Sequence, residues 1–265
     1  MDHTVNLTRA RITAATTAVV LLTACADSDT RDQGAAESIT VFAAASLHEV
    51  FEDIAELYTE ETGTAVTFNV AGSSGLVEQL ENGAPADVLA TADEATMERA
   101  VEGDLIAGEP ALFAENYLVI VTPADNPAGV QSLADLGDDA VETVICAEQV
   151  PCGAATGRIT EASGVQITPV SEETSVTDVL GRVRNGEAEA GLVYATDALQ
   201  AGDEVEAIEI EGAEEDPNLY PIAVVDHAAE PEAGEEFIDF VLTDEQAQQI
   251  LTEAGFVEPQ EHDAA

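Results

Sequence analysis

The run SITVFAAASLHEVFEDIAELY, residues 38–58, determines the fold class of this chain. Its first eight residues are apolar almost without interruption, which predicts a strand that is buried on both faces. After Ser46 the apolar residues change to helical spacing, and acids occupy the positions between them. Gly63 follows as the glycine that commonly ends a helix. A buried strand followed directly by an amphipathic helix predicts an α/β unit.

The same alternation continues along the rest of the chain. Further predicted strands cover residues 64–70, 87–91, 117–121, 143–147, 165–169, 190–194, 206–210 and 220–225. Further predicted helices cover residues 76–81, 93–102, 132–136, 153–163, 176–185, 233–242 and 244–254. Strands that alternate with helices over most of a 265-residue chain predict mainly parallel sheets flanked by helices.

The charge balance excludes several classes of partner. The chain has 54 acidic residues against 7 bases, all of them arginine, and its formal net charge is −47. Nucleic acids and anionic lipid surfaces both attract clustered cations, so neither is an expected partner. The acids are spread along the whole chain, which indicates the solvated carboxylate surface of a salt-adapted prokaryotic protein. The hydrophobic fraction of 46% is that of an ordinary globular chain with a buried core.

The first 25 residues have the pattern of an export signal. Arg9 and Arg11 precede an apolar stretch over residues 12–24 that is too short for a permanent membrane span. The ending Leu-Thr-Ala-Cys resembles a bacterial or archaeal lipoprotein signal, in which Cys25 is lipidated and becomes the mature N-terminus. The alternative is an ordinary secretory signal that is cut near Ala24, with Cys25 as an incidental thiol. Because residues 26–37 are small and polar, they suit a flexible tether, which favours a protein anchored by lipid to the outer face of the cytoplasmic membrane.

Two cysteines remain in the predicted mature chain. Cys146 and Cys152 form an even pair in an exported protein, so they can form a disulfide. Such a short ring would contribute only about 2 kcal/mol to stability on the chain-entropy estimate. Two thiols with no histidine nearby do not make a zinc site.

A secreted hydrolase is the main alternative from another functional class. Ser46 or Ser73 could be combined with His227 and Asp226 into a Ser–His–Asp triad. However, no serine lies in a Gly-x-Ser-x-Gly nucleophile elbow. Adjacent Asp and His side chains on a strand would also point to opposite faces. Surface polar residues are therefore the favoured interpretation, and no catalytic residue is assigned.

Small or hydroxyl-bearing residues recur where a predicted strand ends and a helix begins. They are Ser46, the pair Ser73-Ser74, the segment 151–153 and the pair Thr174-Ser175. Each can be explained singly as a helix N-cap. Four such junctions on one side of α/β layers predict a cleft into which several helix N-termini point. The N–H groups, hydroxyl donors and helix dipoles of such a cleft attract an anion without any formal positive charge.

Several longer segments then resemble a known family. They are ITVFAAASL (39–47), GSSGLVEQLENGAPADVLATAD (72–93), VPCG (150–153), RVRNGEAEAGLVYATDA (182–198) and YPIAVV (220–225). In this order they closely resemble the periplasmic molybdate-binding proteins of ABC importers, which are type II substrate-binding proteins. The resemblance extends over residues 38–258.

The resemblance implies a set of ligand-binding residues. Ser46 and Ser73 match serines that bind the oxyanion in the first lobe of the family's fold. Cys152 and Val176 match positions that use the backbone amide, and Tyr194 matches a phenol donor. Cys152 stands where the family usually has alanine, but the amide survives that change. A metal enters only as part of the bound oxyanion, and no cofactor is expected.

The resemblance also implies the architecture and the activity. It predicts a two-lobed α/β fold with hinge strands near Asn116 and Asn218, each lobe being a mainly parallel sheet flanked by helices. The predicted divisions are a first lobe over 38–115 and 221–258, a second lobe over 116–220, and a tail over 259–265. The implied function is capture of molybdate, and of tungstate as well, by a monomer that delivers the oxyanion to an ABC permease. Two alternatives stay open: a binding protein for another oxyanion such as sulfate, and a lipoprotein that senses the ligand rather than delivering it.

Overall fold

Residues 38–58 form an inner strand of a five-stranded sheet and most of the first long helix that packs on it. The structure, a computed structural model, describes residues 38–260. Strand order in this first sheet is β2-β1-β3-β10-β4. The strands are β1 (Ser38–Ala44), β2 (Ala65–Ala71), β3 (Val88–Ala90), β4 (Ile106–Asn116) and β10 (Asn218–Val225). β1 is parallel to β2 and β3, whereas β10 is antiparallel to β3 and β4, so four of the five strands share one direction.

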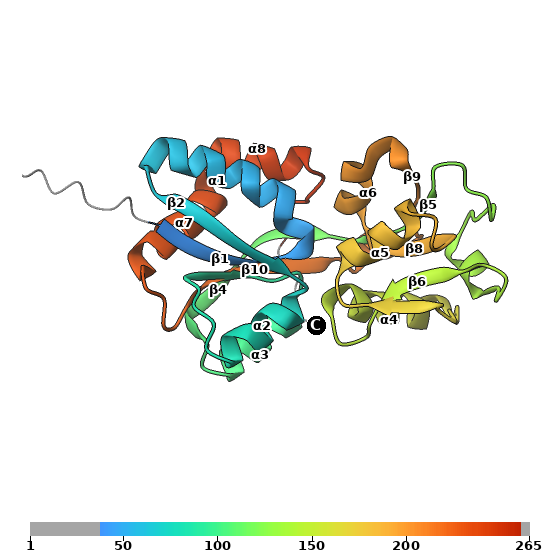
Figure 1. Cartoon of the computed structure of the whole chain (residues 1–265), viewed down its shortest axis with the longest axis horizontal. Coiled ribbons are helices and arrows are strands. Elements are labelled where there is room, and N and C mark those ends of the chain that lie inside the picture. The colour runs from blue at the N-terminus through green and yellow to red at the C-terminus, as the bar shows by residue number, and fades with distance from the viewer. Residues whose placement is uncertain (1–37, 261–265) are drawn as a thin grey trace, which may run out of the picture. The chain divides into compact units, whose positions relative to one another are not determined.

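Helices cover both faces of the first sheet. Figure 1 shows α1 and α8 above it and α2 and α3 below it. The helices are α1 (His48–Thr62), α2 (Ser73–Glu81), α3 (Glu94–Glu102), α7 (Pro231–Thr243) and α8 (Glu245–Glu253). Phe51 and Tyr58 of α1 meet Phe237 of α7 edge to face, with ring centroids 6.1 and 5.3 Å apart. These aromatic contacts pack α1 against α7 through large buried areas.

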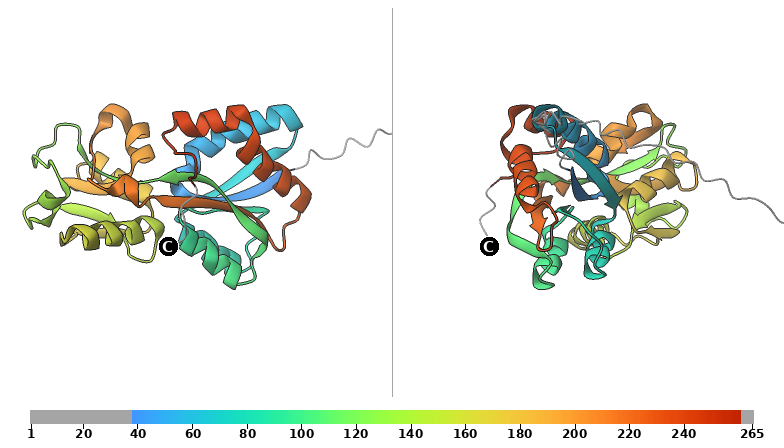
Figure 2. Two further views of the ribbon diagram at one scale, coloured as in Figure 1. Left: turned by 180° about the vertical axis from the view of Figure 1, so that it is seen from behind. Right: turned by 60° about the vertical axis from the view of Figure 1, so that its left-hand side comes forward.

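The second sheet is formed by the middle of the chain, in the order β7-β6-β8-β5-β9. Its strands are β5 (Leu118–Pro123), β6 (Thr143–Cys146), β7 (Ser171–Glu173), β8 (Ala190–Tyr194) and β9 (Val205–Ile208). Its helices are α4 (Pro151–Ser163), α5 (Val176–Arg184) and α6 (Ala195–Ala201). Short 3-10 turns lie at Ala45–Leu47, Leu133–Gly137, Gly202–Glu204 and Ala213–Glu215. Figure 2 shows the helix layers of both sheets from two further directions.

The chain passes between the two sheets at two neighbouring places. β4 ends at Asn116 and β5 begins at Leu118, so only Tyr117 separates the two sheets on the outward path. β10 begins at Asn218 on the return path, and Asn218 lies opposite Asn116 in the antiparallel ladder. The polypeptide therefore leaves and re-enters the first sheet at one point.

The predicted fold class is confirmed, because each sheet has four strands in one direction and is flanked by helices. One predicted strand is wrong. Residues 165–169 alternate in burial as expected, but they form no ladder. Pro169 has no N–H to donate, and pairing with β6 starts only where Val170 N–H donates to the Thr143 carbonyl at 2.8 Å. The strand β7 follows that bond.

Two elements were not predicted. β4 carries Gly108, with φ of 76°, and Pro110, both of which interrupt the strand pattern. Its ladder with β10 also has two irregularities of register. The helix α6 is a short alanine-rich segment directly after β8, without an amphipathic period. The predictions for the signal (1–25), the tether (26–37), Cys25 and most of the tail (259–265) fall on residues outside the described range, apart from 259 and 260.

Candidate functional site

All five residues that the resemblance assigned to ligand binding line one cavity of about 20 Å³. They come from the 3-10 turn after β1 (Ser46), the first turns of α2, α4 and α5 (Ser73, Cys152, Val176) and the end of β8 (Tyr194). The remaining lining residues are Ala44, Ala45, Gly72, Ala92, Val150, Pro151, Thr174 and Ser175. Segments far apart in the chain thus meet at the carboxyl ends of parallel strands, where α/β folds bind ligands.

The cavity is lined by helix N-termini and carries no formal charge. None of the described residues that line it is acidic or basic. The N-cap residues of α2 and α4, Gly72 and Val150, make no side-chain hydrogen bond to the first turn. The first N–H groups of a helix have no intrahelical acceptor, and the helix dipole places partial positive charge there. The arrangement is therefore suited to a small anion held by neutral donors.

Three hydroxyl groups that line the cavity, those of Ser46, Ser73 and Tyr194, already hydrogen-bond with residues outside the lining or elsewhere in it. The Ser73 hydroxyl accepts the Ala92 N–H at 3.0 Å, and the Tyr194 hydroxyl accepts from the Asn218 side-chain amide at 2.8 Å. The Ser46 hydroxyl lies 3.0 Å from the Tyr220 hydroxyl. A hydroxyl that accepts from behind keeps its own proton for another acceptor. The Ser73 hydroxyl is therefore arranged to donate, whereas the Ser46 and Tyr194 hydroxyls each also hydrogen-bond with Tyr220.

Two neighbouring serines use their protons elsewhere. Ser74 donates its hydroxyl to the Gln149 carbonyl at 2.7 Å. Ser175 donates to the Asp178 carboxylate at 2.7 Å and accepts the Asp178 N–H, as an N-cap does. Neither hydroxyl has a proton left to give, which separates Ser73 from Ser74 within the Ser-Ser pair.

The amide at Cys152 is placed by the junction between β6 and α4. Cys146 and Cys152 are joined by a disulfide in the structure, with Cα atoms 5.7 Å apart. The next residue, Gly153, lies so close to this strand end that an added Cβ would meet the Ala147 carbonyl oxygen at 1.8 Å. The disulfide and the glycine together hold the first turn of α4 against the end of β6.

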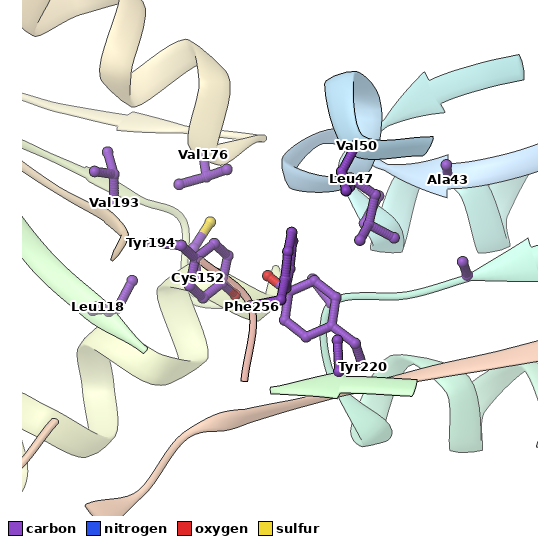
Figure 3. Packing of buried hydrophobic residues seen from close by; sticks show 14 of the residues in the cluster. Ala43, Leu47, Val50, Leu118, Cys152, Val176, Val193, Tyr194, Tyr220 and Phe256 are labelled. Atoms are coloured by element: carbon purple, nitrogen blue, oxygen red, sulfur yellow. The ribbon is translucent and has the colours of Figure 1, made fainter. Parts of the chain in front are cut away.

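Burial keeps the tyrosines of the site protonated. It raises the pKa of Tyr194 well above its ordinary value. Repulsion from Tyr220, Asp93 and Asp197 and a hydrogen bond to Tyr220 raise it further. Burial also raises the pKa of Tyr220. Figure 3 shows the rings of Tyr194, Tyr220 and Phe256 gathered beside Cys152. Tyr220 packs edge to face on Tyr194 at 5.9 Å and on Phe256 at 5.5 Å between centroids.

One buried carboxyl group lies just behind the site. Asp197, in the first turn of α6, accepts the backbone N–H of Tyr194 at 3.1 Å. Its side chain is almost fully buried. Burial raises the pKa of Asp197 to about 7, the Tyr194 hydrogen bond lowers it, and Glu49 raises it.

The residues of the hydrolase alternative are not assembled. His227 is 95% exposed and pairs with Asp226 at 3.2 Å, because both lie in the turn after β10 rather than on the strand. The expectation that these two side chains point apart is therefore wrong. Ser46 and Ser73 have the partners given above. Within residues 38–260, no group of three or more His, Cys, Asp or Glu side chains could hold a metal ion.

Sequence reasoning missed the groups behind the lining. Tyr220, Asn218 and Asp197 each contact a lining residue but come from distant segments or from an unpredicted helix. Asn116 and Asn218 were noted only as hinge positions. The available signal was the position of both asparagines where the chain crosses between the sheets. Both are buried there, and a buried side-chain amide needs hydrogen-bond partners.

Comparisons with known proteins agree on one family. Residues 39–257 match the model of the bacterial extracellular solute-binding proteins. The molybdate-binding protein ModA of Mycobacterium tuberculosis is 44% identical over 225 residues, covering 84% of this chain and 86% of its own. The structure of the Azotobacter vinelandii periplasmic molybdate-binding protein matches with a TM-score of 0.71 and 21% identity, covering 84% of this chain and all of that one.

A solved structure with another ligand in its name has the same fold. The sulfate-binding protein SubI of Mycobacterium tuberculosis matches with a TM-score of 0.73 and 17% identity, over 85% of this chain and 88% of that one. Across residues 38–260, no helix combines the length and apolar character that crossing a membrane requires. The family match extends over nearly all of the described chain, and the chain belongs to the bacterial extracellular solute-binding proteins.

Proposed function

We propose that this protein captures molybdate, and tungstate as well, and delivers it to an ABC permease. The observation that carries the proposal is the cavity formed by Ser46, Ser73, Cys152, Val176 and Tyr194, in which neutral groups alone are placed to donate. Its small size suits an inorganic oxyanion rather than an organic substrate. The identity to the M. tuberculosis molybdate-binding protein supports the choice of oxyanion.

Donation by neutral groups is physically sufficient for such a ligand. A fully desolvated dianion makes charge-assisted hydrogen bonds, which are stronger than those between neutral groups. Sulfate is smaller than molybdate, so in a site spaced for molybdate it would leave several of these bonds stretched. Sulfate remains the second candidate, since the sulfate-binding SubI shares the fold, although that likeness speaks for the fold alone.

The two sheets and their helices are proposed to act as lobes that close around the anion. The proposed lobes are residues 38–115 with 221–258 and residues 116–220, and the proposed hinge is the paired crossing at Asn116 and Asn218. Closure about a short hinge is the usual mechanism of two-lobed binding proteins. No chemical step is proposed, and the protein is taken to act as a monomer.

Calorimetric titration of the purified domain with molybdate, tungstate, sulfate and phosphate tests the proposal. Tight binding of the first two and weak binding of the others is expected. Ser73→Ala should weaken molybdate binding about tenfold or more, because it removes a donor to a buried charge. The matched control is Ser163→Ala at the exposed end of α4, which should bind as the parent does. Sulfate competing at equal concentration would overturn the choice of oxyanion.

The location on the membrane is a separate part of the proposal. Cys25 is proposed to carry the lipid that holds the protein at the outer face of the cytoplasmic membrane. Cys25→Ser should release the protein into the medium of expressing cells, as followed by fractionation and mass spectrometry of the mature N-terminus. A transporter is favoured over a sensor, and a permease and an ATPase encoded beside the gene would separate the two.

A further inference from the structure

A serine beside the proposed ligand site makes a hydrogen bond that joins the two proposed lobes. Ser74, the second residue of α2, donates its hydroxyl to the main-chain carbonyl of Gln149 at 2.7 Å. Gln149 lies 75 positions further along the chain, in the loop between β6 and α4. The neighbouring Ser73 lines the cavity, but Ser74 is not part of the lining. The bond therefore connects the lobes without a contact to the ligand.

This bond lies on the side of the cavity away from the crossing strands. α2 follows β2, the edge strand of the first sheet, whereas the crossing strands β4 and β10 lie toward the opposite edge. In the second sheet, the loop with Gln149 follows β6, and the crossing strand β5 lies beyond β8. Rotation about the crossing separates two atoms in proportion to their distance from it. A small opening angle therefore takes this bond beyond hydrogen-bonding distance.

Both partners of the bond are held within their own lobes. Arg99 of α3 donates from Nη2 to the Ser74 carbonyl at 2.9 Å. On the other side, the Val150 N–H donates to the Ala147 carbonyl at 3.1 Å and closes the turn that contains Gln149. The disulfide between β6 and α4 spans the same turn. Because neither partner can follow the other when the lobes separate, the bond exists only in the closed arrangement.

A local role within α2 does not explain the Ser74 hydroxyl. A serine at the start of a helix commonly accepts an N–H of its own helix. The Ser74 hydroxyl donates instead, and its acceptor belongs to the other lobe. Ser74 is only 6% exposed, so in the closed arrangement the bond is shielded from competing water.

We propose that Ser74 is a latch residue, whose bond to the Gln149 carbonyl holds the lobes closed and sets how long the oxyanion stays bound. The inference rests on the proposed function and gives a role to a residue that does not touch the ligand. Open lobes that admit the anion lack the bond, and closed lobes must break it before the anion leaves. The latch consequently acts on the dissociation rate rather than on the association rate.

Exchange kinetics separate a latch from a ligand contact. Bound radiolabelled molybdate is chased with unlabelled molybdate to give the dissociation rate constant, and calorimetry gives the dissociation constant. Ser74→Ala should raise both constants about three- to tenfold, which is the effect of one lost hydrogen bond between neutral groups. The association rate should then stay within about twofold of that of the parent. Tungstate should be affected by the same factor as molybdate, because the latch touches neither anion.

Gln149→Ala is the matched control on the other partner. It removes the side chain but keeps the main-chain carbonyl, so it should bind and release molybdate as the parent does. Without ligand, Ser74→Ala should melt at the temperature of the parent, because open lobes do not make the bond. A lower melting temperature together with slower association would show that the substitution damages α2, and the latch would be overturned.

The remaining outcomes distinguish the latch from the proposed function. An unchanged dissociation rate in Ser74→Ala, or different factors for molybdate and tungstate, would refute the latch. A loss in Gln149→Ala as large as that in Ser74→Ala would place the contact on the Gln149 side chain and would also refute it. If the parent protein bound neither oxyanion, the proposed function itself would fail, whereas tight binding with unaltered release from Ser74→Ala would refute only the latch.

Discussion

Val176 tests whether a backbone amide rather than a side chain binds the anion. It is the first residue of α5, and the N-cap residue before it, Ser175, is extended, with ψ of 155°. Proline is tolerated at a first helical position and favours an extended residue before it. Val176→Pro should therefore fold but lose about 1.5–3 kcal/mol of molybdate binding, while Val176→Ala keeps most of the affinity. Calorimetry measures both variants, with circular dichroism to check folding. Equal affinities in two folded variants would remove Val176 from the site.

Asp197 should make stability fall as pH rises. Because its folded pKa is about 7 and thus above the ordinary value of 3.8, the folded state holds a proton that the unfolded state has lost between these values. The free energy of unfolding should decline from about pH 4 to about pH 7, by at most about 4 kcal/mol from this group. Asp197→Asn should abolish that decline in urea denaturation, whereas the exposed Asp203→Asn should keep it. A parent and an Asp197→Asn protein with parallel pH profiles would contradict the assignment.

The lining residues of the site were predictable, but their supporting groups were not. Ser46, Ser73 and Tyr194 stand in short motifs that a family resemblance can match one by one. Asn218 supports Tyr194 across 24 residues of sequence, and Tyr220 reaches Ser46 across 174. No local period encodes such contacts, because they depend on where the two crossings place β10. Whether a hydroxyl donates or accepts is decided by its neighbours in the fold and cannot be read from the residue type.

Among the elements, prediction succeeded where the hydrophobic period was strong. β1 and α1 have continuous and helical apolar patterns, and both form as expected. β4 was not predicted, because Gly108 and Pro110 interrupt its strand pattern. Its pairing with β10 is itself irregular. β7 is three residues of Ser and Glu, without any apolar signal, and it forms only because β6 offers an edge.

The disulfide between β6 and α4 should matter more for stability than for binding. Reduction should lower the free energy of unfolding by about 2 kcal/mol, since the bridge closes a short loop with a sequence separation of 6. Molybdate affinity should change less than about threefold, because the amide of residue 152 is retained and Gly153 still fits against Ala147. Urea denaturation with and without reductant measures the effect. The Cys146→Ser/Cys152→Ser protein serves as a control that reductant should not alter, and a large loss of affinity on reduction would show that the bridge shapes the site.

For the whole molecule, closure should depend on the missing side chain of Gly72. Its φ of −59° and ψ of 137° suit alanine. However, an added Cβ would meet the Thr174 carbonyl oxygen at 2.2 Å, and Thr174 lies between β7 and α5 of the second sheet. Gly72→Ala should therefore leave the melting temperature nearly unchanged but weaken molybdate binding about tenfold or more, because the closed arrangement is disfavoured. Calorimetry measures the affinity, and small-angle scattering shows whether ligand still makes the molecule more compact.

The control for closure is Gly75→Ala, one turn further along α2. An added Cβ at Gly75 has no neighbour within 4 Å, so this variant should bind like the parent and gain slight helix stability. If both alanine variants bound equally well, the contact between Gly72 and Thr174 would have no part in ligand capture.

The acidic surface predicts a strong response to salt. Each of the four arginines in the described region already pairs with acids, at Glu81, Asp216, Glu173, Glu187 and Glu204. Most of the 54 acids consequently repel one another without compensation. Molar salt shortens the Debye length to about 3 Å, so the melting temperature should rise steeply from about 0.05 to 2 M KCl. A flat profile would contradict the interpretation of a salt-adapted surface.

The position of β10 also determines the order in which the chain can fold. This strand is the last of the ten in sequence, yet it lies between β3 and β4 inside the first sheet. The first sheet cannot close its hydrogen bonds until residues 218–225 have arrived, whereas all strands of the second sheet lie within one continuous segment. Contacts between distant segments form late, because the connecting loop must first be closed. β4 and one side of β3 consequently stay unpaired until almost the whole chain is available, a delay that suits a polypeptide threaded unfolded through an export channel.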